Sequence, residues 1–125
     1  VIPKVAGLQG MRAILERISA SHRGSFRAVL KTFGAANNNL LSFPMEGYTL
    51  ALDFKLEPGL LELLDELDSM VLAYGGRLYL AKDARMSEAT FKQSQPNWQQ
   101  FQEVRAQYGA LGKFASLQSR RLGLD

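Results

Sequence analysis

The 125-residue sequence contains no cysteine and a single histidine, His22. Without cysteine the chain can form no disulfide, thiol nucleophile or zinc–thiolate site, and its composition does not reveal a redox compartment. A lone histidine beside an arginine is a poor metal ligand. We therefore expect His22 to lie on the surface at the end of a helix, where its partial charge is favourable.

Long apolar runs and a strong excess of one charge are also missing. No stretch approaches the ~18 apolar residues of a membrane span, so no transmembrane segment is predicted. The 15 basic and 12 acidic residues leave a net charge of only +3. They are mixed along the chain, which argues against a nucleic-acid partner. The pair Gly75-Gly76 follows a helical pattern and not a strand, so it is not a phosphate-binding loop.

An apolar content of 46% and a charged content of 22% are typical of a globular chain that buries a core. At this length we expect one domain or a piece of one. The first residues, Val1-Ile-Pro3, read as the end of a truncated strand. With no initial methionine and no signal-peptide pattern, the sequence is expected to be part of a longer protein.

Hydrophobic periodicity predicts helices over residues 5–21 and 59–74 and strands over residues 26–33, 48–54 and 77–81. Together with the truncated first strand, the order is strand, helix, strand, strand, helix, strand. This order predicts an α+β fold of the split βαβ, or ferredoxin-like, type. Its antiparallel sheet would carry both helices on one face, and residues 87–125 would form a helical tail that docks on domain 1–86 or on the rest of the protein.

The face of the sheet without helices is the expected wall of a site. Alternation along the strands places five side chains there: Lys31, Phe33, Thr49, Ala51 and Tyr79. A lysine among apolar neighbours is unusual for a core. It would either extend to solvent or line a cleft.

Three charges, Lys82, Asp83 and Arg85, follow the last predicted strand. Unpaired buried charges are costly, so these side chains either pair with one another or face a site. By position, Lys82 could stabilise negative charge beside a redox ring, and Tyr79 could donate its phenol to the same site. In the alternative interpretation Lys82 pairs with Asp83 or Glu88, and Tyr79 packs in the core.

Several segments together resemble a known family: 75–85 (GGRLYLAKDAR), 26–34 (FRAVLKTFG), 41–44 (LSFP) and 119–124 (SRRLGL). The sequence is similar to the C-terminal region of FAD-linked oxidoreductases with the vanillyl-alcohol-oxidase architecture. The greatest similarity is to the decaprenylphosphoryl-ribose 2′-oxidase family. The resemblance implies an enzyme that oxidises a hydroxyl of a sugar or lipid-linked sugar. Its FAD would be bound mainly by an N-terminal domain outside these residues, and this fragment alone would be inactive.

The resemblance also implies roles for single residues. Lys82 would be catalytic and, with Tyr79, would contact the flavin. The substrate side would be lined by Lys31, Phe33, Thr49 and Ala51. In a similar member of this family an asparagine and a cysteine occupy the positions of Thr49 and Ala51, so the resemblance leaves the exact substrate open.

The residues alone leave two other classes of function open. One is a stand-alone ferredoxin-like module that binds a small ligand or RNA on its sheet. The other is an interaction domain whose helical tail mediates oligomerisation. A cytoplasmic location and a peripheral membrane location both remain compatible with the sequence.

Overall fold

The computed structural model describes residues 1–125 and has the α+β fold predicted from the sequence. Three antiparallel strands form one sheet in the order β1-β3-β2. The strands are β1 (Ile2–Pro3), β2 (Arg27–Phe33) and β3 (Gly47–Asp53). The helices are α1 (Gly7–Ala20), α2 (Leu60–Ala73), α3 (Glu88–Ser94), α4 (Trp98–Gln107) and α5 (Leu117–Arg121), with 3-10 turns η1 (Lys4–Ala6) and η2 (Leu80–Lys82). None of these helices has the length and apolar content needed to span a membrane.

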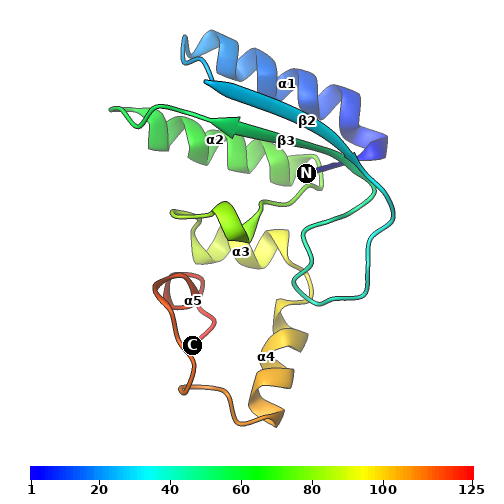
Figure 1. Ribbon diagram of the computed structural model, residues 1–125, viewed down its shortest axis with the longest axis vertical. Coiled ribbons are helices and arrows are strands. Elements are labelled where there is room, and N and C mark those ends of the chain that lie inside the picture. The colour runs from blue at the N-terminus through cyan, green and yellow to red at the C-terminus, as the bar shows by residue number, and fades with distance from the viewer.

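The main core lies between the sheet and the helices α1 and α2, which pack side by side (Figure 1). Its buried members are Ile2, Ile14, Ile18, Leu60, Leu63, Leu67 and Val71. Leu50 and Leu52 of β3 and the following Phe54 pack against this cluster. The same face of the strand therefore meets both helices, as the apolar stripes of the two helices predicted.

The strand predicted over residues 77–81 does not form, and that prediction is wrong. Residues 77–79 have no regular structure, and residues 80–82 form η2. Only Arg77 pairs with the sheet: its N–H donates to the Val1 carbonyl at 3.0 Å, and the Val1 amino group donates to the Arg77 carbonyl at 2.8 Å. Strand β1 has only two residues, so the segment after Arg77 finds no neighbour for a hydrogen-bond ladder.

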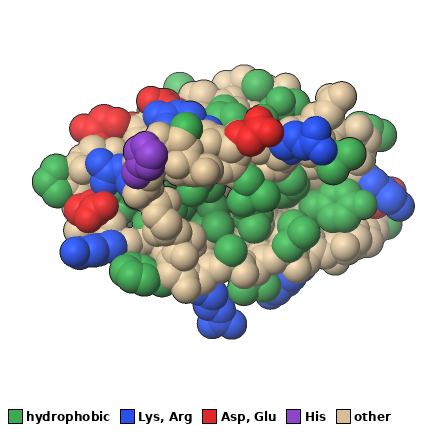
Figure 2. Space-filling view, turned by 90° about the horizontal axis from the view of Figure 1, so that it is seen from above, with side chains coloured by type: hydrophobic (Ala, Val, Ile, Leu, Met, Phe, Trp, Pro, Cys, Tyr) green, Lys and Arg blue, Asp and Glu red, His purple; other side chains and the backbone are tan.

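The exposure of side chains on the two faces of the sheet differs from the prediction. Thr49, expected on the open face, is 8% exposed. Conversely, Phe26 and Leu30 are on the helix side, opposite Phe54 and Leu50, yet they are 77% and 62% exposed. The physical reason is that α1 contacts β1 and β3 and leaves edge strand β2 largely uncovered. Figure 2, which looks down on α1 and β2, shows hydrophobic side chains in a hollow with charged side chains around it.

Residues 87–125 fold back onto the segment 77–86 and build a second apolar cluster. Its buried members are Met86, Phe91, Leu122 and Leu124, with Leu78, Leu80, Trp98 and Phe101 packed around them. Helix α3 begins where the sequence predicted, because the Ser87 hydroxyl accepts a hydrogen bond from the Thr90 amide at 3.1 Å. Two clusters thus meet at the segment that carries Lys82.

Candidate functional site

One cavity of about 790 Å³ contains every site residue predicted from the sequence. These residues come from β2, β3 and the segment 77–82: Lys31, Phe33, Thr49, Ala51, Tyr79 and Lys82. Strand register brings the first four together, because Lys31 lies directly opposite Thr49, and Phe33 lies two residues further along β2. The volume is in the range typical of small-molecule sites.

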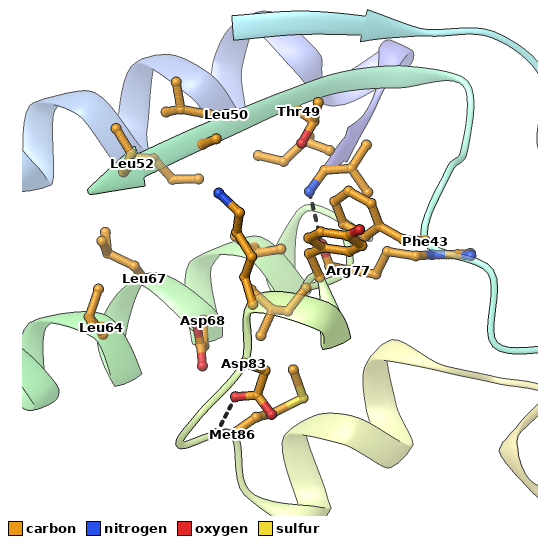
Figure 3. Close-up of a pocket in the computed structure, with 18 of the residues that line it drawn as sticks. Phe43, Thr49, Leu50, Leu52, Leu64, Leu67, Asp68, Arg77, Asp83 and Met86 are labelled. Atoms are coloured by element: carbon orange, nitrogen blue, oxygen red, sulfur yellow. Dashed lines mark hydrogen bonds between the residues drawn. The ribbon is translucent and has the colours of Figure 1, made fainter. Parts of the chain in front are cut away.

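The walls of the cavity are mainly apolar. Leu50 and Leu52 of β3 lie on one side, and Leu64 and Leu67 of α2 lie on the other (Figure 3). An apolar wall with a few polar groups is the usual composition of a site that binds a largely hydrophobic ligand. No group of His, Asp or Glu side chains is arranged to hold a metal ion.

Phe43 belongs to the site although the strand pattern did not predict it. Its ring is 4.8 Å from that of Tyr79 and 5.7 Å from that of Phe33, the latter in an edge-to-face arrangement. The loop that carries Phe43 is also held by Arg77, whose guanidinium donates to the Ser42 carbonyl at 2.7 Å. Aromatic contacts and one partly buried hydrogen bond thus fix residues 42 and 43 across the end of the sheet. Phe43 is in the segment 41–44 that resembles the oxidases, and this was the only signal for it.

Two of the three charges that follow the segment 77–81 pair with distant side chains. Arg85 donates to Asp68 at 2.8 Å and to the Leu64 carbonyl at 2.9 Å, and it also pairs with Asp65. Asp83 accepts a hydrogen bond from Arg121 at 2.7 Å. These contacts fasten the segment to α2 on one side and to α5 on the other.

The third charge, Lys82, is exposed and forms no ion pair, and its side chain lines the cavity. Neither carboxylate considered as its partner is available to it in the structure. Asp83 pairs with Arg121, and Glu88 pairs with Lys92. Tyr79 is 47% exposed and is not a core residue. The contacts expected in the alternative interpretation are therefore not formed, and the site roles of Lys82 and Tyr79 stay predictions.

Burial acts differently on the two acidic side chains beside the cavity. For Asp68, burial raises the pKa, and the hydrogen bond from Arg85 offsets this only in part. For Asp83, burial would also raise the pKa, but hydrogen bonds from the Met86 amide, Arg121 and the Arg85 amide outweigh it and lower the pKa. Asp83 is thus a firmly ionised anchor, which leaves Lys82 as the one of these three charges without an ion pair.

An α+β sheet domain with an apolar cavity and a free lysine fits the oxidoreductase class that the sequence resembles, and comparison with known proteins confirms the resemblance. The chain is 40% identical over 124 residues to the decaprenylphosphoryl-beta-D-ribose oxidase of Mycolicibacterium smegmatis (strain ATCC 700084 / mc(2)155). The matched region covers 99% of this chain and 27% of that oxidase. It is also 36% identical over 115 residues to an uncharacterized protein in the mprA 5′ region of Streptomyces coelicolor, covering 91% of this chain and 31% of that protein.

No protein-family model matches the sequence. The chain spans less than a third of the length of both relatives. The similarity therefore concerns one region of each relative.

Proposed function

We propose that this chain forms the substrate-side part of an FAD-dependent oxidoreductase that oxidises a hydroxyl of a sugar or lipid-linked sugar. In this proposal the chain corresponds to the C-terminal region of the enzyme, and another part of the longer protein holds most of the flavin. The observation that carries the proposal is the cavity itself, which joins Lys82 and Tyr79 to the four residues predicted to bind the substrate. The name of the Mycolicibacterium relative supplies the substrate class.

The residues of the cavity fit one edge of a flavin ring, but they do not fit the whole of FAD. The chain has no glycine-rich phosphate loop, so a diphosphate would have to be bound elsewhere. Lys82 and Tyr79 offer an ammonium and a phenol, donors suited to the electron-rich edge of a flavin ring. When bound, FAD would supply the acceptor for the hydride that leaves the alcohol carbon, and the hydroxyl proton would pass to solvent water.

Lys82 would orient the substrate hydroxyl and stabilise negative charge that develops beside it. Once another part of the longer protein covers the cavity, this ammonium would have more effect than one in bulk water, because the local dielectric constant would be lower. Lys31 would attract an anionic group of the substrate, such as a phosphate, from the opposite wall. Phe33, Thr49 and Ala51 would set the shape of the pocket around the sugar.

The test is Lys82→Ala in the protein expressed from its complete reading frame. We expect substrate-dependent flavin reduction, measured with decaprenylphosphoryl-β-D-ribose as the probe, to fall by roughly a hundredfold, while the melting temperature stays unchanged. Lys55→Ala is the matched control, because Lys55 is exposed, unpaired and outside the cavity. Equal losses of activity in the two variants, or unfolding of Lys82→Ala, would contradict the proposed role.

A further inference from the structure

The cavity continues as a slot along one edge of β3. Strand β3 pairs with β2 over its whole length, but it pairs with β1 only at Gly47 and Tyr48. Residues 49–52 have no strand partner on the β1 side. Side chains from both faces of β3 line the cavity, Thr49 and Ala51 from one face and Leu50 and Leu52 from the other. At this edge of β3 the cavity therefore extends from one face of the sheet to the other.

The opposite wall of the slot is the segment that was expected to form a strand. Leu78 and Tyr79 line the cavity there, directly after Arg77. At Arg77 the width of the gap between β3 and the segment 77–80 is known. Val1 pairs with Arg77 on one side of this gap, and the adjoining Ile2 pairs with Tyr48 on the other. One strand thus fits between β3 and the segment 77–80 at this point, and the slot continues in the same direction.

The environment of Val1 suits a peptide group better than a charged amine. Val1 is 8% exposed, and its nitrogen donates to the Arg77 carbonyl at 2.8 Å. Burial, together with the charge of Arg77, lowers the pKa of the amino group to about 6. A peptide N–H at the same place would make the same hydrogen bond without the cost of burying a charge.

We propose that, in the longer protein, the polypeptide directly before Val1 extends β1 through this slot. It would pair with residues 49–53 on one side and with residues 78–81 on the other. The segment after Arg77 would then gain a partner and become the fourth strand. The sheet order would be 77–81, β1, β3, β2, which is the complete split βαβ arrangement.

The existing register predicts where each added side chain points. Ile2 is opposite Tyr48, so the first residue before Val1 would lie opposite Leu50, and the second would lie opposite Ala51. The pair formed by Val1 and Arg77 places the same two residues opposite Leu78 and Tyr79. Directly opposed residues share a face of the sheet. The first added residue therefore points to the core, where Leu50 and Leu78 already pack.

The second residue before Val1 would point to the open face, between Ala51 and Tyr79. Both of these side chains line the candidate site. This added residue is therefore a further substrate-side position, and only this consequence rests on the proposed function. The strand itself follows from the backbone and does not depend on any activity.

A disulfide cross-link in the full-length protein tests the strand and its register. Cysteine at the second position before Val1 is combined with Ala51→Cys, and the matched control combines it with Leu52→Cys. Opposed residues in a sheet are within disulfide reach, whereas residue 52 points to the other face. Peptide mass mapping after mild oxidation should find the bridge to position 51 and not to position 52. A bridge to position 52 in preference, or to neither, would overturn the proposal.

Hydrogen exchange on the unmodified full-length protein decides the question if a cysteine variant does not fold. A strand paired on both edges protects consecutive amides, whereas a strand paired on one edge protects alternate ones. We expect all four amides of residues 49–52 to exchange slowly. Alternating fast and slow exchange would rule out the added strand. Neither measurement uses catalysis, so this proposal and the proposed oxidation can fail independently.

Discussion

The core between α1 and α2 and the junction around residues 83–86 are stabilised in different ways. In the core, Leu63 and its neighbours are buried among other apolar side chains. In the junction, Asp83 accepts hydrogen bonds from Arg121 and from two backbone amides, and Arg85 connects to α2. Apolar burial depends mainly on filled volume, whereas buried charges depend on particular partners. In the core, the loss of side-chain volume should therefore lower stability most. In the junction, the loss of a charge should do so.

The largest expected effect is in the core. Leu63 is 3% exposed, so Leu63→Ala should lower the free energy of unfolding by about 3 kcal/mol through lost burial and the cavity left behind. Leu61, on the same helix, is 49% exposed, and Leu61→Ala should cost less than about 1 kcal/mol. Urea denaturation of both variants provides the measurement. Similar losses would mean that α2 does not pack as described.

The next effect is in the junction. Asp83→Asn should cost about 2 kcal/mol, because the Asp83 side chain is only 7% exposed and Arg121 loses its charge partner. The loss should appear first as faster hydrogen exchange in residues 117–124. Arg120→Gln is the control, since Arg120 and Asp125 form an exposed pair. Unchanged exchange in residues 117–124 would show that Asp83 does not anchor α5.

The pH dependence of this effect follows from the lowered pKa of Asp83. The carboxylate stabilises the folded state fully above its ordinary pKa of 3.8, and this contribution is lost as the pH falls through the lower folded-state value. The difference in stability between the wild type and Asp83→Asn should therefore shrink in acid.

The smallest effect is expected at Asp68, which pairs with an arginine as Asp83 does. Burial raises the pKa of Asp68, so folding favours its neutral form relative to the unfolded chain. The resulting stabilisation of the folded state is fully present below the ordinary pKa of 3.8, and it is lost as the pH rises through the folded-state pKa. Arg85 also keeps Asp65 and the Leu64 carbonyl as partners. Asp68→Asn should therefore cost less than about 1 kcal/mol at pH 7. A cost at pH 7 as large as that of Asp83→Asn would show that ionised Asp68 is a net stabiliser.

The elements that the sequence predicted well depend on local patterns. Helices α1 and α2 and strands β2 and β3 lie within about two residues of their predicted bounds, because periodicity is a property of the segment itself. The strand predicted over 77–81 does not form because a strand needs a neighbour, and β1 has only two residues. The pairing of Asp83 with Arg121 joins positions 38 apart, and no local pattern encodes it.

The same distinction applies to the candidate site. Alternation identified the side chains of β2 and β3 that share a face, and the register then brought them together. It could not show that Thr49 is buried, because burial depends on the tertiary fold, or that Phe43 reaches Tyr79, because the loop that carries Phe43 has no periodicity. Lys82 was identified as one of three charges, but its lack of a partner became visible only once the partners of the other two were known.

Gly76 sets a limit on the geometry of the whole cavity. A Cβ atom at this position would lie 2.4 Å from the Val1 carbonyl oxygen and 2.8 Å from a methyl carbon of Val71, so only glycine lets the chain pass this close. The contact fixes how near the segment that carries Tyr79 and Lys82 comes to the sheet. The spacing between the sheet and this segment is thus set by a residue that has no side chain and is not part of the cavity wall.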